Sequence, residues 1–138
     1  MAQGYREERP LFDVFAYFDG EVEAWGYFAS RSGRVVRRFR VTIQGRVIGD
    51  TLTLNESFAY SDGTTSSRVW SIRKTGEHSY VGTAGDVIGT ADGVAYGNSL
   101  HWEYTLALDV GGRSYAVEFD DWMYLQDGGT LLNKSVVS

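Results

Sequence analysis

Four charged residues interrupt stretches of the sequence in which every second residue is apolar. Arg37, Glu56 and Asp121 each stand two positions from an apolar residue on both sides. Arg68 shares its alternating set with Trp70, two positions further along the chain. Because side chains two apart on a strand lie on one face, we expect all four charges to point into a hydrophobic interior.

An inward charge needs a partner, since an unpaired ion in a dry core costs several kcal/mol or more. Together the four residues are formally neutral, and we expect Asp121 to pair with Arg37 or Arg68. The set fits a polar network that fixes strand register. It also fits a cavity whose charges hold the polar end of an otherwise apolar ligand. A third interpretation is acid–base catalysis, with Asp121 or Glu56 as the catalytic group.

The ligand-holding interpretation also uses large aromatic residues on the same inward faces. These rings would form the apolar wall of a cavity, while the charged residues would be its polar contacts. The predicted ligand-binding residues are Arg37, Phe39, Glu56, Tyr60, Arg68, Trp70, Trp102 and Asp121.

The elements that must position these residues are strands. Pairs such as Asp19-Gly20 and Gly49-Asp50 recur along the chain, many about 10–15 residues apart, the spacing typical of hairpins. Between these turns the apolar residues alternate with a period of two. We expect strands near 21–31, 34–48, 51–61, 65–75, 78–84, 88–97, 99–110, 113–125 and 129–138.

Consecutive hairpins predict an all-β fold, an antiparallel up-and-down barrel of about eight to ten strands. An open sandwich is the alternative. Residues 11–18 are expected to form a short helix or a strand at one end. The predicted organisation is an N-terminal extension over 1–10, which is flexible, and one barrel domain over 11–138.

The run from Phe119 to Tyr124 places two carboxylates side by side in sequence. On a strand, Asp120 and Asp121 point to opposite faces, so they cannot act as one catalytic dyad. We expect Asp120 to face solvent or a turn. Trp122 should also point outward, covered by the N-terminal segment or by a partner.

Composition excludes several functions. The net charge is −5, so nucleic acid is not an expected partner. The chain has no cysteine, and its two histidines, His78 and His101, lack clustered carboxylates in the sequence, so we expect no metal and no cofactor. No apolar stretch has the length of a membrane span, and residues 1–10 do not resemble a signal peptide.

Several sequence blocks resemble a known family. They include Tyr17-Phe18-Asp19-Gly20, Phe58-Ala59-Tyr60-Ser61-Asp62-Gly63, Gly82-Thr83-Ala84-Gly85-Asp86-Val87-Ile88-Gly89 and Phe119-Asp120-Asp121-Trp122-Met123. The chain is similar, over roughly residues 10 to 138, to an uncharacterised proteobacterial lipoprotein family, domain of unknown function 3833. The resemblance implies a lipocalin-like barrel, placed in the periplasm or at the cell envelope and often anchored by a lipidated cysteine. Members are often encoded beside fatty-acid-modifying enzymes, which points to lipid.

Two features depart from that family. The chain has no cysteine that could carry the lipid anchor. It also ends at Ser138, where the family resemblance implies one more strand. Without that strand we expect a gap in the barrel with two free edges, and such edges favour pairing into a homodimer.

The leading prediction is a non-enzymatic barrel that binds a lipid or another apolar small molecule at the bacterial cell envelope. The alternatives are a small barrel enzyme, an isomerase or a lipid-modification accessory with an inward carboxylate, and a filled barrel that serves as an interaction module. The volume of the interior separates these cases, because an aromatic-packed core leaves no room for a ligand.

Overall fold

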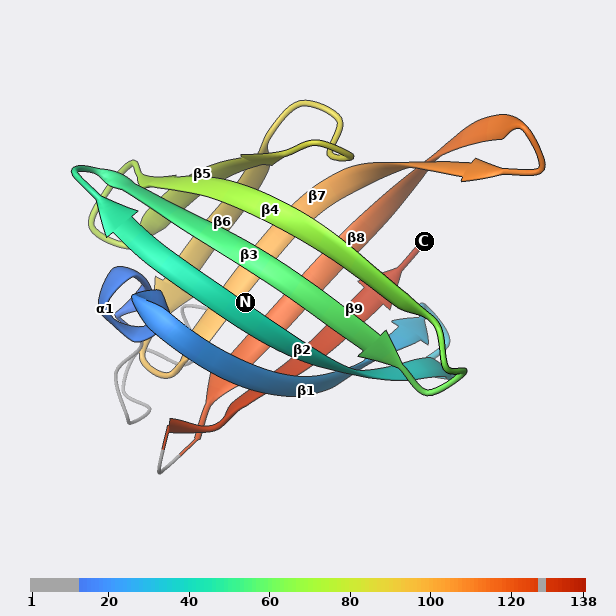
Figure 1. The fold of residues 1–138 in the computed structure, drawn as a ribbon, viewed down its shortest axis with the longest axis horizontal. Coiled ribbons are helices and arrows are strands. Elements are labelled where there is room, and N and C mark those ends of the chain that lie inside the picture. Colours follow the sequence, from blue (N-terminus) through green and yellow to red (C-terminus); the bar gives the residue numbers. More distant parts are fainter. Residues whose placement is uncertain (1–12, 127–128) are drawn as a thin grey trace.

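Nine strands follow one another along the chain, and each pairs with the next to form a closed barrel (Figure 1). The structure is a computed structural model that describes residues 13–126 and 129–138. The strands are β1 (Gly20–Ser30), β2 (Val35–Ile48), β3 (Thr51–Tyr60), β4 (Thr65–Lys74), β5 (Ser79–Ala84), β6 (Ala91–Tyr96), β7 (Ser99–Val110), β8 (Arg113–Leu125) and β9 (Leu131–Val137). The barrel prediction is therefore confirmed, and the open sandwich is wrong. The extension predicted over 1–10 lies outside the described residues.

The hairpin turns explain why neighbouring strands in sequence are neighbours in the sheet. Gly49, between β2 and β3, and Gly97, between β6 and β7, adopt positive φ values of 63° and 55°. Glycine reaches this conformation without the steric penalty of a Cβ atom, and tight hairpins require it. The predicted strand near 88–97 is shorter than expected, because residues 85–90 form a turn. In that turn the Ile88 amide bonds back to the Thr105 carbonyl of β7.

The barrel closes through a parallel pair, which the sequence-based prediction of an antiparallel sheet missed. β1 and β9 run side by side in the same direction, from Ala24 opposite Leu131 to Ser30 opposite Val137. An up-and-down barrel with an odd number of strands must join its first and last strands in parallel. Among the described strands no free edge remains, so the predicted gap is wrong. The dimer expected through that gap loses its physical basis.

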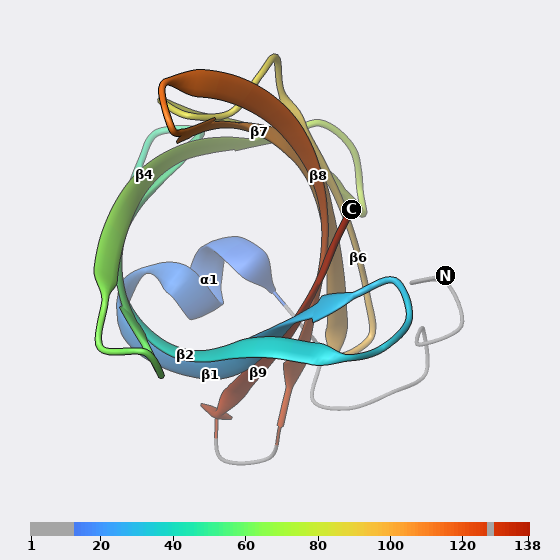
Figure 2. The same cartoon turned by 90° about the vertical axis from the view of Figure 1, so that its right-hand side faces the viewer.

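One end of the barrel is covered by a short helix, α1 (Val14–Phe18). Figure 2 looks along the barrel from the opposite end and shows α1 lying across the far side of the ring. Val14 and Phe18 are buried, and the Asp13 side chain caps the helix by accepting from the Ala16 amide. The Phe18 carbonyl lies where a Cβ atom on Gly45 would be, so this glycine lets the helix seat against β2.

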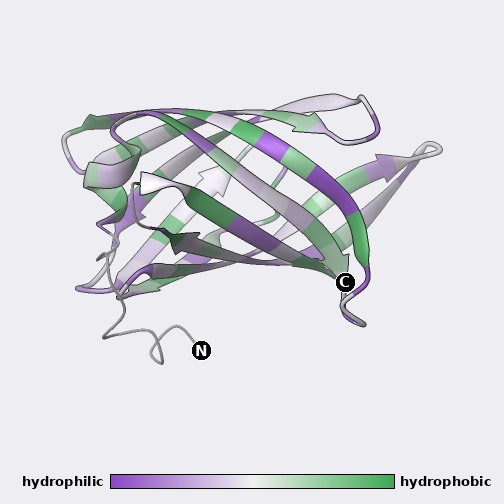
Figure 3. Cartoon of the chain, turned by 90° about the horizontal axis from the view of Figure 1, so that it is seen from below, coloured by the Kyte–Doolittle hydropathy of each residue, from purple (hydrophilic) through white to green (hydrophobic). Residues whose placement is uncertain are grey.

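Side chains alternate between the inside and the outside of the wall. Figure 3 shows hydrophobic and hydrophilic residues alternating along the strands. The buried set is dominated by one inward cluster that includes Phe39, Leu52, Trp70 and Trp102. Alternation with a period of two therefore predicted the inward faces correctly. In the described part of the chain, no helix has the length and apolar character needed to span a membrane.

Candidate ligand-binding cavity

The barrel is not filled by its side chains. It surrounds a partly open cavity of about 370 Å³ whose wall extends from Val14 and Phe18 of α1 to Thr64 and Ser66 at the β3–β4 hairpin. Cavities of about 300–1,000 Å³ are the usual size for small-molecule sites. All of the predicted ligand-binding residues lie on this wall: Arg37, Phe39, Glu56, Tyr60, Arg68, Trp70, Trp102 and Asp121. That they bind a ligand stays a prediction.

Glu56 lies inside the barrel on β3, and part of its surface faces the cavity. Its Oε1 accepts a 3.0 Å hydrogen bond from Trp70 Nε1 on the neighbouring strand. Burial raises the pKa of Glu56 to about 7, and the Asp121 carboxyl adds to the rise. Arg68, opposite Glu56 in the β3–β4 register, and the Trp70 hydrogen bond oppose this rise without cancelling it.

Asp121 is buried, as predicted, but an arginine is not its hydrogen-bonding partner. Its Oδ2 accepts a 2.6 Å bond from the Tyr104 hydroxyl, and its Oδ1 accepts a bond from the Ser135 hydroxyl. Burial raises the pKa of Asp121 to about 6, although both hydroxyl bonds favour the charged form. Desolvation also raises the pKa of Tyr104 well above its usual range. The predicted pairing of Asp121 with Arg37 or Arg68 is therefore wrong.

Arg68 instead pairs with Asp86, in the turn after β5. Arg68 Nε lies 2.9 Å from Asp86 Oδ1, and Arg68 Nη2 lies 3.0 Å from Asp86 Oδ2, so the pair is bidentate. The hydrogen bonds from Arg68 hold the pKa of Asp86 below its usual value. The sequence placed Asp86 between the strands expected near 78–84 and 88–97, and nothing in the pattern marked it as the partner of Arg68. Asp86 nevertheless stood within one of the blocks that suggested the family.

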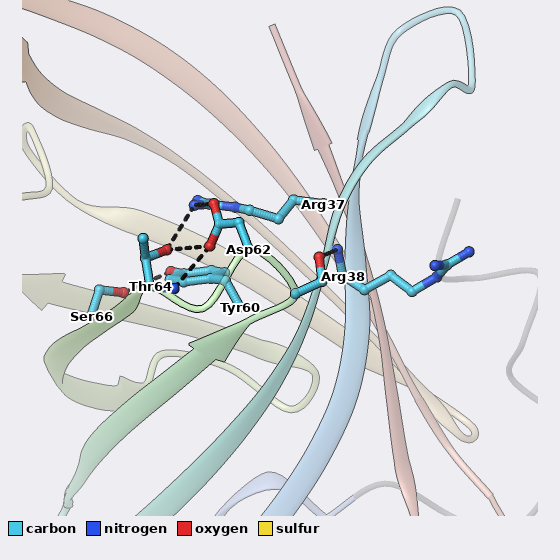
Figure 4. Close-up of polar contacts among 7 residues, drawn as sticks. Arg37, Arg38, Tyr60, Asp62, Thr64 and Ser66 are labelled. Atoms are coloured by element: carbon cyan, nitrogen blue, oxygen red, sulfur yellow. Dashed lines mark hydrogen bonds and ion pairs between the residues drawn. The ribbon is translucent and has the colours of Figure 1, made fainter.

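At the end of the barrel opposite α1, the cavity wall includes several polar residues of the β3–β4 hairpin and Arg37. Figure 4 shows the polar contacts that Arg37, Tyr60 and Thr64 make there. Arg37 Nη1 lies 3.3 Å from Asp62 Oδ2, and the Arg37 guanidinium carbon lies 3.8 Å from the centre of the Tyr60 ring. The Tyr60 hydroxyl shares a 2.7 Å hydrogen bond with Ser66. Hydrogen bonds from the Thr64 side chain and amide hold the pKa of Asp62 below its usual value. Arg37 thus belongs to the rim of the cavity.

Trp102 forms part of the apolar wall of the cavity. Its ring lies where Cβ atoms on Gly82 and Gly93 would be, at 2.7 and 2.3 Å from those positions. Trp70 packs edge-on against it, with ring centres 5.3 Å apart. Two glycines on neighbouring strands therefore create the space that this indole occupies.

The outer face of β7 and β8 carries a cluster that the sequence did not reveal. His101 Nε2 lies 3.1 Å from Asp120, and His101 Nδ1 lies 3.3 Å from Glu103, so the expectation that this histidine is isolated from carboxylates is wrong. Trp122 stacks on the His101 ring at 4.0 Å. The N-terminal cover predicted for Trp122 would come from residues outside the described ones.

Within the described residues, His101, Glu103 and Asp120 form the group that could hold a metal ion. The two carboxylates, however, contact opposite nitrogens of one imidazole ring. That arrangement suits a histidine with a hydrogen bond to Asp120 and a second carboxylate, Glu103, near its other nitrogen, whereas a metal ion would take one of those nitrogens for itself.

These features define a small closed β-barrel with an internal cavity that combines aromatic walls with buried carboxyl groups. The chain matches, over residues 1–138, the family described as Protein of unknown function (DUF3833), and it belongs to that family. No curated protein and no solved structure matches the chain.

Proposed function

We propose that the protein is a non-enzymatic, lipocalin-like barrel that binds a lipid or another largely apolar small molecule in its cavity. The observation that carries the proposal is the cavity of about 370 Å³ inside a barrel with so many aromatic residues. An interaction module with a filled barrel would have no such space, because protein cores pack nearly without voids. The cell envelope, which the family resemblance implies, is the location we propose for this activity.

The composition of the wall supports an amphipathic ligand. Phe39, Trp70 and Trp102 offer an apolar surface, while Glu56 and Arg68 add polar groups at the same cavity. Small-molecule sites usually combine a mainly hydrophobic wall with a few polar groups that orient the ligand. A ligand with one polar group and an apolar body fits this division.

A neutral fluorophore, N-phenyl-1-naphthylamine, tests the proposal. We expect it to bind, to change tryptophan emission, and to be displaced by extracted phospholipids or fatty acids. Trp102→Ala should weaken binding severalfold, because it removes an aromatic wall. Trp25→Ala is the matched control, since Trp25 is 45% exposed on the outside of the barrel. Saturating lipid that changes neither tryptophan emission nor the melting temperature would overturn the proposal, because ligands of the native state stabilise it.

Acid–base catalysis is the second candidate, and the pKa of Glu56 near 7 favours it. A carboxyl group with this pKa can both accept and donate a proton at neutral pH. Incubation of the protein with envelope lipids in deuterated water, followed by mass spectrometry, separates the two functions. Protein-dependent deuterium uptake or a new product that Glu56→Gln abolishes would favour an enzyme. Unchanged lipids that stay bound would favour a carrier.

A further inference from the structure

Both arginines of the cavity wall already have carboxylate partners. Arg37 contacts Asp62 at 3.3 Å, and Arg68 holds Asp86 through two hydrogen bonds of 2.9 and 3.0 Å. Each of these pairs is formally neutral. An anionic ligand group would therefore have to share an arginine with a carboxylate that already neutralises its charge.

Two further carboxyl groups on the wall have no cation in hydrogen-bond contact among the described residues. Asp121 is satisfied by the hydroxyls of Tyr104 and Ser135, which occupy both of its oxygens. Glu56 receives one bond, from Trp70 to its Oε1, and no donor in the described part of the chain reaches its Oε2. Glu56 also keeps surface open to the cavity. It is the carboxyl group best placed to accept from a ligand.

We propose that Glu56 seats the ammonium group of an amphipathic amine, whose apolar body lies against the aromatic wall of the cavity. This inference rests on the proposed function, because it names the class of ligand for the same cavity. An ammonium group offers three donors and one positive charge, so it could donate a hydrogen bond to Glu56 Oε2 and place a cation in direct contact with this carboxyl. A fatty-acid carboxylate would instead be repelled by two carboxyl groups that have no arginine in hydrogen-bond contact, Glu56 and Asp121.

Binding of an ammonium should be linked to the proton on Glu56. The groups that act on this carboxyl are Arg68 on β4, which favours its charged form, and Asp121 and Asp86, which disfavour it. The hydrogen bond from Trp70 also favours the charged form. Burial outweighs the favourable contacts and raises the pKa of Glu56 to about 7, so this carboxyl can hold a proton near neutral pH. Ammonium binding selects the ionised form, and the proton passes to the buffer.

Isothermal titration calorimetry with three probes that share one tail tests the inference: decylamine, decanol and decanoate. Near pH 8, where Glu56 is ionised, we expect decylamine to bind at least about tenfold more tightly than decanoate. Near pH 5 the affinity for decylamine should fall, although the amine itself stays charged. In buffers of different ionisation enthalpy near pH 7, decylamine binding should release a fraction of a proton per bound ligand, because only the protonated part of the protein gives one up.

Glu56→Gln should lose the preference for decylamine and the proton release while it still binds decanol, because the amide can accept the Trp70 bond. Glu23→Gln, the same change on the outer face of β1, should behave as wild type. If none of the probes binds wild-type protein, the proposed function fails. If decanoate or decanol binds at least as tightly as decylamine, or if Glu56→Gln keeps the preference, the amine inference fails and the carrier function stands.

Discussion

The Tyr104 hydroxyl donates a 2.6 Å hydrogen bond to Asp121 Oδ2, and this contact joins β7 to β8 inside the barrel. In the β7–β8 register, Asp121 lies opposite Trp102, so Tyr104 reaches it diagonally, from two residues further along β7. The Ser135 hydroxyl of β9 bonds the other oxygen of the same carboxylate. One buried carboxyl group thus links three neighbouring strands next to the point where the barrel closes.

Tyr104→Phe removes one of the two donors to Asp121 and should destabilise the fold. Near pH 8, where Asp121 is ionised, we expect a loss of about 1–3 kcal/mol in the free energy of unfolding. Near pH 5, below the folded-state pKa of about 6, the carboxyl is neutral and the loss should be smaller. Urea denaturation at both pH values measures this difference. Tyr115→Phe, in a side chain that is 48% exposed, is the control, and equal losses for the two variants would contradict the assignment.

Period-two alternation predicted which side chains face inward. It also separated two neighbouring carboxylates correctly. Asp121 is buried, while Asp120 lies on the outer face beside His101. The partner of Asp121 could not be predicted in the same way. Alternation predicts which face of the sheet a residue lies on. It predicts neither the register between strands nor which hydroxyl group on a neighbouring strand contacts that residue. Arginine was the partner expected for a buried carboxylate, and two hydroxyls took its place.

The partner of Arg68 could not be predicted from alternation either, because it lies in a loop. Its partner Asp86 comes from a turn, where no periodicity fixes the direction of a side chain. Barrel closure is a third case. Turn spacing predicts pairs that are adjacent in sequence, whereas the contact of β1 with β9 depends on the number of strands and their tilt. Local sequence rules contain neither quantity.

Stability should fall as the pH rises from about 5 to 8, and Glu56 should be a main cause. The pKa of Glu56 is about 7 in the folded protein, compared with an ordinary value of 4.5 for a glutamate side chain. A carboxyl group whose pKa is raised by folding contributes stability. That contribution is complete below the pKa of the unfolded state and is lost as the pH rises through the pKa of the folded state. For a group that faces a cavity open to water, we expect a loss of about 1–3 kcal/mol.

Glu56→Gln should flatten this pH profile in urea denaturation, because the amide does not titrate. Asp121, with a pKa of about 6, contributes with the same sign, so part of the slope should remain. Asp62 and Asp86 have lowered pKa values and act with the opposite sign, at pH values below this range. Glu23→Gln should keep the wild-type profile. A Glu56→Gln profile as steep as that of wild type would show that this carboxyl ionises normally.

Gly93→Ala should disturb the tryptophan that lines the cavity. A Cβ atom at this position would lie 2.3 Å from the Trp102 ring, so the indole must move or the strands must separate. Overpacking of this kind typically costs about 1–3 kcal/mol. We also expect shifted tryptophan emission and weaker probe binding. Gly85→Ala is the control, since a Cβ atom there meets nothing within 4 Å, and an equal effect of both variants would contradict this packing.

A double-mutant cycle can establish whether Arg68 interacts more strongly with Asp86 or with Asp121. The bidentate pair with Asp86 joins a mostly buried arginine side chain, 16% exposed, to a carboxylate side chain that is 40% exposed. Arg68→Met and Asp86→Asn should therefore show a coupling energy of about 1–2 kcal/mol in chemical denaturation, since partial exposure weakens the pair. Arg68→Met and Asp121→Asn should couple more weakly, because these two side chains attract each other electrostatically but form no hydrogen bond. Stronger coupling to Asp121 would reinstate the pairing predicted from the sequence.

The same variants report on the electrostatics of the cavity. Arg68 favours the charged form of Glu56, so Arg68→Met should raise the pKa of Glu56 further and move the pH-dependent loss of stability to higher pH. Asp86→Asn should act in the opposite direction, because it removes a negative charge and leaves the arginine free to contact Glu56. If the amine inference holds, Asp86→Asn should also shift the preference of the cavity from decylamine toward decanoate. An unchanged preference would mean that Arg68 does not act on the ligand site.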